Sequence, residues 1–407
     1  MQRGPEGDVL RHRRGRSLTA VTILFALAAI YYLVATVTFA IGLIRRRDER
    51  STEKPFVSVV IAARNEDAYL GRCLDSLGAQ TYPTDRYEIL VVDDDSTDRT
   101  RQVAEQYDAV RVLSPLPAYA DYAAKKRPMA SGIAEARGDL ILTTDADCTT
   151  EPGWIEATVS HFTENVDVVV GYSSVAPVGQ GWVHRLQAFD FFAMLAAAAG
   201  AIGAGSLWAA TGQNLAYRKR LFDRVGGYTS VAGRASGDDV LLAQLFRKAG
   251  AQATFCFDPA GHTTTWRVES LRGLIRQRTR WASNARVQAK LNPALFLYVT
   301  SVLSINILPI LALAAGGHIA SLCLIAWGLR FLTDATITVI AARRLRVSPG
   351  LLFLPAWMLL QVPYVLIVGF AGSLLGFEWK NRQHRSSASM TVTYPPTNQR
   401  GTSHAKM

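Results

Sequence analysis

An uncharged run near the N-terminus constrains this chain more than any other feature. Residues 18–44 carry no charged side chain, and at about 1.5 Å per residue a helix of that length crosses a hydrocarbon core of roughly 30 Å. A signal peptide is the alternative, but its apolar core is shorter, and Arg45, Arg46 and Arg47 follow this run as a stop-transfer flank would. We therefore expect residues 1–50 to form a short tail and a retained transmembrane anchor.

Further apolar stretches lie towards the C-terminus. They cover residues 294–316, 318–340 and 351–376. The second contains Arg330 and Asp334, which are four residues apart and can pair on one helix face. Charges inside a membrane usually mark a functional site, and a self-neutralising structural pair is the alternative. In the third, Pro355 and Pro363 would kink or break a spanning helix. A single span there would export the basic residues Lys380, Arg382 and Arg385, so this stretch could instead be a kinked hairpin or an interfacial helix. We predict membrane segments over 293–378.

The arginines between these stretches predict the orientation of the chain. The link at residues 316–318 has no Lys or Arg, whereas the next link carries Arg343, Arg344 and Arg346. By the positive-inside rule the arginine-rich link is cytoplasmic, and so is everything between the anchor and residue 294. We expect a multi-pass protein of the cell membrane with a cytoplasmic central domain. We expect a basic, disordered tail at 379–407. The sequence does not decide on which side of the membrane this tail lies.

Charge and cysteine content exclude several classes of protein. Lys and Arg number 44 against 33 Asp and Glu, a net charge of +11 that suits nucleic acid, anionic lipid or phosphate-bearing substrates. Hydrophobic residues make up 49% of the chain, which excludes disorder along its whole length. Cys73, Cys148, Cys256 and Cys323 lie far apart and follow no metal-ligand spacing. They indicate reduced thiols rather than a disulfide scaffold.

The central region alternates short apolar runs with helical patterns. Strand-like runs cover 56–62, 88–92, 139–144 and 166–170, and helical patterns cover 68–80 and 100–107. This alternation predicts a largely parallel, Rossmann-like sheet, with ligands at the carboxyl ends of its strands. We therefore predict an α/β domain over 51–292, flanked by transmembrane helices. The Ala-, Gly- and Phe-rich run at 189–210 should be a buried or membrane-skimming helix of that domain.

Acidic residues follow two of the predicted strands. The second strand runs into Asp93 and Asp94, and the third runs into Asp145 and Asp147. A carboxylate just past a strand can accept hydrogen bonds from a base or a ribose. Two carboxylates one residue apart can bind a hard divalent cation, which neutralises a diphosphate. One such pair alone is more often a solvated loop, but its occurrence at successive strand ends favours a ligand site.

Six sequence elements follow one another between residues 57 and 281. They are VSVVIAARNED (57–67), VVDDDSTDRT (91–100), TTDADC (143–148), TGQNLAYRKRLFDRVGGY (211–228), SGDDVLLAQLFRKAG (236–250) and QRTRW (277–281). In this order they resemble family 2 glycosyltransferases of the GT-A fold, in their membrane-integral form. The second departs from the family's VVDDGSTD only at Asp95, where glycine is usual. The last matches the family's Q-x-x-R-W. The resemblance implies a catalytic domain that uses a nucleotide-sugar donor.

The resemblance also implies which residues bind the donor. Ala63 and Glu66 would lie beside the pocket for uracil or guanine, and Asp93 and Asp94 would bind the base and the ribose. Lys125 matches a basic position that precedes the family's small-residue helix.

The roles of the two residues that follow Lys125 stay open, whereas the resemblance assigns the metal ligands directly. For Lys126 and Arg127 a solvated basic turn is an equally good interpretation. Asp145 would touch the ribose and the metal, and Asp147 would be the principal ligand of a divalent cation, Mg²⁺ or Mn²⁺.

Displacement of a nucleoside diphosphate from a sugar needs a base on the opposite face of the sugar, which takes the proton of the acceptor hydroxyl. The resemblance assigns this role to Asp239. Asp238 is the near rival, and two adjacent carboxylates are also common at a helix N-terminus. We expect Asp238 mainly to orient its neighbour or to cap the helix that begins at Val240. Such a base implies a single in-line displacement with inversion and no covalent enzyme intermediate.

Much of the basic excess lies at residues 269–290. Arg272, Arg276 and Arg280 recur every four residues and would form one cationic stripe on a helix. A solvated face is one interpretation. The position directly before an apolar stretch favours an interfacial helix against anionic headgroups.

This helix also contains the Q-x-x-R-W residues. Gln277, Arg280 and Trp281 would lie at the mouth between donor site and membrane, near the diphosphate or the acceptor. Nucleic-acid binding is disfavoured because no recognition motif accompanies the charge.

The sequence thus predicts a membrane-bound, metal-dependent, inverting glycosyltransferase. It would move a sugar from a UDP- or GDP-sugar to a lipid, lipid-linked or saccharide acceptor, in cell-envelope polysaccharide or glycolipid synthesis. A single transfer is favoured because three C-terminal segments offer little for a polymer channel. A processive polysaccharide synthase, for which Q-x-x-R-W argues, is the alternative. A second alternative is an inactive nucleotide-sugar-binding scaffold subunit, against which the intact acidic pairs argue. The expected partners are donor, acceptor and membrane lipids, without nucleic acid.

Overall fold

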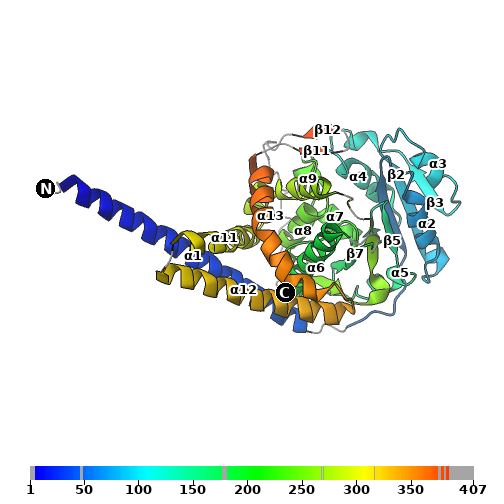
Figure 1. The fold of residues 1–407 in the computed structure, drawn as a ribbon. Coiled ribbons are helices and arrows are strands. Elements are labelled where there is room, and N and C mark those ends of the chain that lie inside the picture. The colour runs from blue at the N-terminus through cyan, green and yellow to red at the C-terminus, as the bar shows by residue number, and fades with distance from the viewer. Residues whose placement is uncertain are drawn as a thin grey trace, which may run out of the picture.

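The computed structural model of the chain describes residues 5–45, 49–176, 181–266, 268, 270–315, 317–374, 377–379 and 382–384. An α/β domain and a group of long helices make up this structure, and the N-terminal helix extends away from the domain (Figure 1). Most of the predicted tail at 379–407 lies outside the described residues, as do Arg46, Arg47 and the first residue of the predicted 269–290 helix.

The elements follow the predicted alternation of strands and helices. The strands are β1 (Val57–Ala63), β2 (Tyr87–Asp93), β3 (Val110–Leu113), β4 (Leu140–Thr143), β5 (Cys148–Thr150), β6 (Val168–Gly171), β7 (Ser173–Val175), β8 (Leu215–Arg218), β9 (Ala253–Cys256), β10 (Thr263–Thr265), β11 (Phe377–Trp379) and β12 (Arg382–His384). The helices are α1 (Pro5–Ile44), α2 (Leu70–Gly78), α3 (Thr100–Ala104), α4 (Lys126–Glu135), α5 (Trp154–Val159), α6 (Trp182–Gly203), α7 (Lys219–Arg224), α8 (Val240–Lys248), α9 (Leu271–Ala282), α10 (Ala285–Leu291), α11 (Pro293–Ala315), α12 (Gly317–Leu345) and α13 (Leu354–Leu374).

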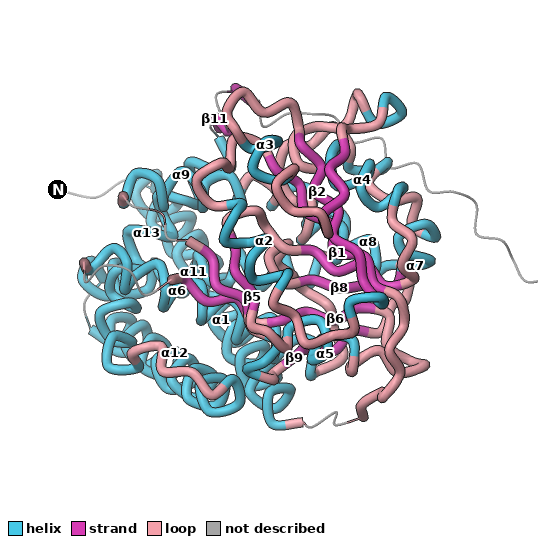
Figure 2. The backbone as a smooth tube through the Cα atoms, turned by 90° about the vertical axis from the view of Figure 1, so that its right-hand side faces the viewer, coloured by secondary structure: helices cyan, strands magenta, loops and turns pink. Residues whose placement is uncertain are grey.

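A seven-stranded sheet in the order β3-β2-β1-β4-β8-β6-β9 organises the domain (Figure 2). Strand β1 runs parallel to β2 and β4, as predicted. Strand β8 is antiparallel to both of its neighbours, β4 and β6, so the sheet is mixed rather than fully parallel. An apolar run reads alike in either direction, which is why the sequence pattern did not reveal the reversal.

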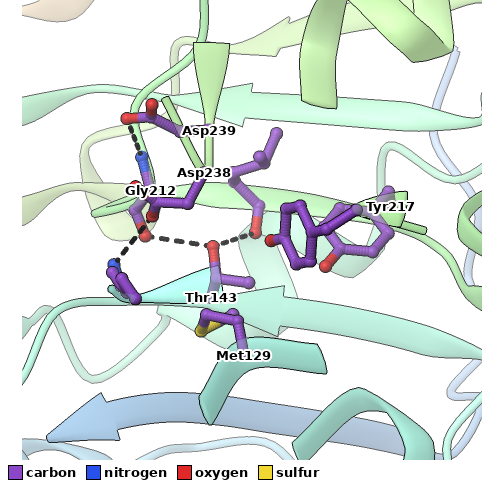
Figure 3. Close-up of a pocket in the computed structure, with 9 residues that line it drawn as sticks. Met129, Thr143, Gly212, Tyr217, Asp238 and Asp239 are labelled. Atoms are coloured by element: carbon purple, nitrogen blue, oxygen red, sulfur yellow. Dashed lines mark hydrogen bonds and ion pairs between the residues drawn. The ribbon is translucent and has the colours of Figure 1, made fainter. Parts of the chain in front are cut away.

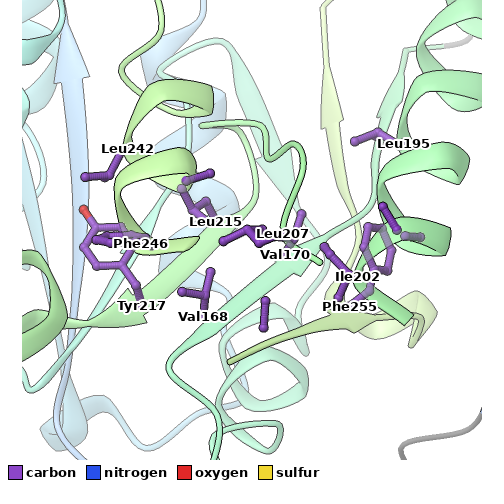
Figure 4. Packing of buried hydrophobic residues seen from close by; sticks show 14 of the residues in the cluster. Val168, Val170, Leu195, Ile202, Leu207, Leu215, Tyr217, Leu242, Phe246 and Phe255 are labelled. Atoms are coloured by element: carbon purple, nitrogen blue, oxygen red, sulfur yellow. The ribbon is translucent and has the colours of Figure 1, made fainter. Parts of the chain in front are cut away.

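Apolar layers cover both faces of this sheet, because successive side chains of a strand point to opposite sides. Val59 of β1 belongs to one buried cluster and Val60 to the other. In β6, Val168 and Val170 pack towards α6 and α8, whereas Val169 joins the opposite layer (Figure 4). Burial on both faces explains why these strands are continuous apolar runs.

The described residues include five helices that are long and apolar enough to cross a membrane: parts of α1, α6, α11, α12 and α13. Helix α1 lies beside α11 and α12 (Figure 1) and also packs on α6. The helix predicted at 189–210 is α6, which begins earlier, at Trp182, and is mostly buried.

Glycines set the crossing of α1 and α6. A methyl group on Gly42 would lie 2.0 Å from the carbonyl oxygen of Gly200, and one on Gly203 would lie 2.1 Å from that of Gly42. Only hydrogen fits at these positions, as in other close helix crossings between small residues. The glycines that interrupt the apolar run of α6 therefore join the domain to its N-terminal helix.

Two helix predictions need correction. Residues 354–374 form one helix with Pro363 inside it, so neither proline breaks it and the hairpin alternative is wrong. Pro355 is the second residue of α13, where a backbone N–H has no partner within the helix. The single helix predicted at 269–290 is two helices, α9 and α10. At the break, Asn284 donates to the Ser236 hydroxyl at 3.1 Å, and the Ser283 carbonyl accepts from Arg234 at 2.8 Å.

The predicted pair of Arg330 and Asp334 exists, with 3.3 Å between Nε and Oδ2. Arg330 also donates to the side chains of Asn306, at 2.8 Å, and Gln361. Tyr32 donates to Asp334 at 2.5 Å. The pair therefore joins α1, α11, α12 and α13, which favours the structural interpretation over a separate functional site.

Candidate active site

A cavity of about 940 Å³ lies where the α/β domain meets the long helices. The predicted site residues in its wall are Ala63, Glu66, Asp94, Lys125, Asp145, Asp147, Asp238, Asp239, Gln277, Arg280 and Trp281. Strands β1, β2 and β4 end at this cavity because they are parallel neighbours, so the residues that follow them meet at one edge of the sheet. Asp93 is the one predicted site residue outside the lining.

The loops after β1 and β2 are joined by short contacts. The Ala63 carbonyl accepts from the Asp94 N–H at 2.8 Å. The Asp94 carboxylate accepts from Arg127 Nε at 2.7 Å and lies 3.5 Å from Arg64. Arg127 also pairs with Asp95, so the interpretation of Arg127 as a solvated turn residue is wrong. Asp95 has φ +54°, a conformation that Asp tolerates better than most residues, which explains why it can stand where the family has glycine.

Asp93 lies behind this loop. Its side chain is 7% exposed, and Oδ2 is 3.5 Å from Arg101. Its Oδ1 is buried without a hydrogen-bond partner among the described residues. Of the two carboxylates predicted to bind base and ribose, the structure places only Asp94 in the wall.

Two carboxylates and a thiol form the candidate metal centre. Ligand atoms of Asp145, Asp147 and Cys148 lie within 4.8 Å of one another. Burial, with the charges of Asp145 and Glu66, raises the pKa of Asp147 to about 7, so this cluster has an excess of negative charge that a cation would relieve. Burial raises the pKa of the Cys148 thiol well above its usual value. The carboxylates are thus the fitting ligands for a hard ion such as Mg²⁺ or Mn²⁺.

Lys125 connects the candidate metal centre to the acidic pair. Its ammonium group pairs with Asp145 and lies 3.4 Å from Asp238. Burial alone would lower the pKa of Lys125, but the charges of Asp145 and Asp238 outweigh it and raise that pKa. Lys125 is therefore a cation that links the two acidic groups.

Lys126 is 1% exposed, so its interpretation as a solvated turn residue is also wrong. Its ammonium group donates to the carbonyls of Arg234, at 2.6 Å, and Ser236, at 3.0 Å. Burial lowers its pKa to about 8. These bonds hold the loop that leads into Asp238.

Asp239 caps α8, the role predicted for Asp238. Its Oδ1 accepts from the N–H of Val240 at 2.6 Å and its Oδ2 from that of Gly212 at 3.0 Å. Figure 3 shows the bond that the Asp239 carboxylate accepts from the Gly212 N–H. The Thr143 hydroxyl donates to the Gly212 carbonyl at 3.0 Å and so holds Gly212 in place beside Asp239. The prediction assigned the cap wrongly because either of two adjacent aspartates can satisfy a helix N-terminus.

The two aspartates differ electrostatically. Burial and the charge of Asp238 raise the pKa of Asp239. Burial would also raise the pKa of Asp238, but Lys125, Lys126 and Arg280 lower it overall. Asp239 is therefore the more basic of the pair.

Helix α9 brings Gln277, Arg280 and Trp281 to the cavity, whereas Arg272 and Arg276 are exposed. The predicted cationic stripe is thus divided between solvent-facing residues and the cavity. Arg280 makes no side-chain hydrogen bond or ion pair with another described residue.

Arg278, within Q-x-x-R-W, is a residue that the sequence reasoning missed. It is 4% exposed and bonds to Asp190 at 3.0–3.1 Å and to Tyr364 at 3.0 Å. Its guanidinium lies 4.0 Å from the Trp281 ring centroid. The signal that could have found it is Asp190, a lone acid in an apolar helix that needs a cationic partner.

Comparisons with known proteins place the chain in a family. A model described as "Glycosyl transferase family 2" matches residues 58–226. The glycosyltransferase AglE of Haloferax volcanii is 31% identical over 213 residues, which span 51% of this chain and 66% of AglE. The beta-monoglucosyldiacylglycerol synthase of a Synechocystis species is 30% identical over 147 residues, 35% of this chain and 30% of the synthase.

A solved structure, the mannosyltransferase PcManGT from Pyrobaculum calidifontis in complex with GDP-Man and Mn²⁺, is similar with a TM-score of 0.55 at 20% identity. The match covers 80% of this chain and 97% of that one, and it confirms the predicted GT-A fold class. Sequence and fold thus agree: residues 58–226 of this chain form a glycosyltransferase family 2 domain.

Proposed function

We propose that this chain is a membrane-bound glycosyltransferase that transfers a sugar from a UDP- or GDP-sugar to a lipid, lipid-linked or saccharide acceptor, with inversion. One observation carries the proposal. The carboxylates after β2 and β4 line the same cavity as the Asp238–Asp239 pair and the Q-x-x-R-W residues. A nucleotide, a diphosphate and a hydroxyl acceptor can therefore meet in one cavity.

The donor would lie against the ends of β1, β2 and β4. Ala63 and Glu66 would flank the base, and Asp94 would accept hydrogen bonds from the ribose. Asp93, which lies behind the wall, would act by positioning Asp94. Arg280, which has no described partner, would neutralise charge on the leaving diphosphate, with Trp281 beside it.

Asp145 and Asp147 would hold the divalent cation, which supplies positive charge to the diphosphate when bound. PcManGT was solved with Mn²⁺ and GDP-Man, which supports a divalent cation for this family member also.

Asp239 would accept the proton of the acceptor hydroxyl as the acceptor oxygen bonds to the sugar's C1 and the C1–O bond to the diphosphate breaks. Its raised pKa makes it the better base of the acidic pair, and Asp238, neutralised by Lys125, would orient the site. A base opposite the leaving group gives inversion in one displacement.

A donor screen tests the proposal. Membranes or purified protein would be incubated with individual UDP- and GDP-sugars and Mg²⁺ or Mn²⁺, and released nucleotide would be measured. We expect release with one donor and none with the Asp239→Asn variant. Binding without release would indicate a scaffold subunit, and long products would indicate a processive synthase.

We further propose that the α/β domain faces the cytoplasm. Arg344, near the end of α12, donates to the carbonyls of Leu43, at 2.6 Å, and Arg45, at 3.0 Å. Its guanidinium lies 3.9 Å from the Phe257 ring centroid. The C-terminal ends of α1 and α12 therefore meet beside the domain, and the arginines there would keep that side inside.

Cysteine labelling in intact cells tests this orientation. The native cysteines Cys73, Cys148, Cys256 and Cys323 are all buried, so an introduced exposed thiol gives a clean signal. An impermeant maleimide should label His318→Cys at the start of α12 but not Ser348→Cys beyond its end. The opposite pattern would overturn the orientation.

A further inference from the structure

We propose that the acceptor is a membrane lipid with a free hydroxyl headgroup, and that its acyl chains occupy the part of the cavity formed by α6, α11 and α13. This inference rests on the proposed function and narrows it to one acceptor class. In the transfer, the lipid hydroxyl oxygen bonds to the sugar's C1, its proton passes to Asp239, and the nucleoside diphosphate leaves.

The first support is the continuity of the cavity. Residues from all five apolar helices line it, together with the carboxylates of the donor site. Its volume of about 940 Å³ is at the upper end of the range for a site that holds one small molecule, about 300–1,000 Å³. The cavity extends from the donor-site carboxylates to residues of the membrane-type helices.

The second support is the change in chemistry along the wall. The carboxylates and Lys125 come from the α/β domain, whereas the long helices supply mostly apolar residues together with a few polar ones such as Asp190, Asp334 and Gln361. The aliphatic residues are Leu195, Ala197 and Ala198 of α6, Val299, Val302 and Leu303 of α11, and Val365 and Val368 of α13. This division of the wall matches an amphiphile whose headgroup reaches the base while its chains stay among apolar side chains.

The wall is also incompletely covered at its helix end. Met194 of α6 and Val299 of α11 line the cavity and are 39% and 42% exposed. A lipid could therefore enter from the side between the helices. The aliphatic side chains named above offer a soluble sugar chain no hydrogen-bonding partner, and Gln361 and Tyr364 are the polar residues of α13 that line the same cavity.

The headgroup should be neutral. Lys125 lies beside Asp238, but among the described residues Asp239 accepts only two backbone N–H bonds, and its carboxylate would repel a phosphate that acted as the nucleophile. A neutral hydroxyl fits there and also needs the base that Asp239 provides.

Photo-crosslinking tests the lipid site without any donor. Full-length protein in phosphatidylcholine nanodiscs would receive dioleoylglycerol with a diazirine in one acyl chain, and crosslinked peptides would be mapped by mass spectrometry. We expect crosslinks at Val299, Leu303, Val365 and Val368 that excess dioleoylglycerol removes and dioleoylphosphatidylcholine, which has no free hydroxyl, does not. Crosslinks confined to outward residues such as Leu359, or unaffected by competition, would overturn the proposal.

Transfer gives the second readout. With the labelled donor found by the screen, dioleoylglycerol should carry label into the organic phase. The Val365→Trp/Val368→Trp double variant should lose at least tenfold of that label and keep its nucleotide affinity. Leu359→Trp also places a tryptophan on α13, at a position that is 63% exposed and outside the lining, and it should behave as wild type.

The outcomes separate the two proposals. Competed crosslinks without nucleotide release from any donor would reject the transferase function and leave the lipid site standing. Nucleotide release with a water-soluble polymer as product would reject the lipid acceptor, as would equal lipid labelling by the double tryptophan variant and wild type.

Discussion

The two ends of the cavity are built in different ways. At the donor end, acidic residues sit in short loops directly after neighbouring strands and pair with basic residues at the start of α4, as Asp94 does with Arg127 and Asp145 with Lys125. At the helix end, contacts join distant parts of the chain: Tyr32 and Asp334, which share a hydrogen bond, are 302 positions apart. The donor end therefore depends on a few local groups, and single substitutions there should have large effects. The helix end depends on tertiary packing, and substitutions there should impair it more gradually.

The largest effect is expected at the donor end, from Asp147→Ala. Loss of a ligand to the divalent cation should remove several kcal/mol of transition-state stabilisation, so turnover should fall by at least about 10³-fold. Chelation of wild-type protein with EDTA should do the same, and added Mg²⁺ or Mn²⁺ should restore activity to wild type but not to the variant.

The matched control is Asp85→Ala, whose side chain is 81% exposed and lies outside the cavity wall. It should keep full activity. A wild-type rate that EDTA leaves unchanged would show that Asp147 does not act through a metal.

The sequence predicted which residues meet at the donor end better than it predicted the contacts of the helix end, for a physical reason. Parallel strands bring their following loops to one edge, so the strand ends alone indicated that Asp94, Asp145 and Asp147 would lie close together, whereas their roles were implied by the family resemblance. The Arg278–Asp190 pair joins two helices far apart in the chain, and no spacing rule connects them. The choice of Asp239 as helix cap also depended on backbone geometry at Gly212, which the acidic pair itself does not encode.

The acidic pair lies between the two ends and gives the next prediction. Asp239→Asn should lower kcat/KM by about 10²–10⁴-fold with nucleotide affinity near wild type, because the amide cannot take the acceptor's proton. Asp238→Asn should cost less. If the pair belonged to the donor site instead, both variants would lose nucleotide binding.

The pH dependence identifies the base independently. Asp239 must be deprotonated to act, so the rate should fall as pH drops through its pKa, which burial and Asp238 raise above the ordinary value. Asp238→Asn removes a neighbouring negative charge, which lowers that pKa, so the acid limb of kcat/KM at saturating metal should move to lower pH. An acid limb that moves to higher pH in Asp238→Asn would assign the base elsewhere.

The smallest effect on chemistry is expected at the helix end, from Arg278→Met. Among the described residues, the variant leaves the buried Asp190 carboxylate only the Tyr364 hydroxyl as donor, at 3.3 Å. Loss of one partner from a buried ion pair destabilises proteins by about 3–5 kcal/mol, whereas replacing both partners is often nearly neutral. Asp190→Asn/Arg278→Met should therefore be more stable than Arg278→Met alone.

Thermal unfolding in one detergent and nucleotide affinity would be measured on the same preparations. Together they test whether the helix end and the donor end of the cavity are independent. Arg272→Met, on the same helix and exposed, is the matched control and should match wild type in both. If the two ends are independent, Arg278→Met will unfold at a lower temperature yet bind the nucleotide as wild type does. The reason is that Asp94 and the proposed metal ligands follow strands of the sheet and do not lie on α9. A parallel loss of affinity would show instead that α9 transmits the packing of the helices to the donor loops, through the bonds of Ser283 and Asn284 to the loop before Asp238.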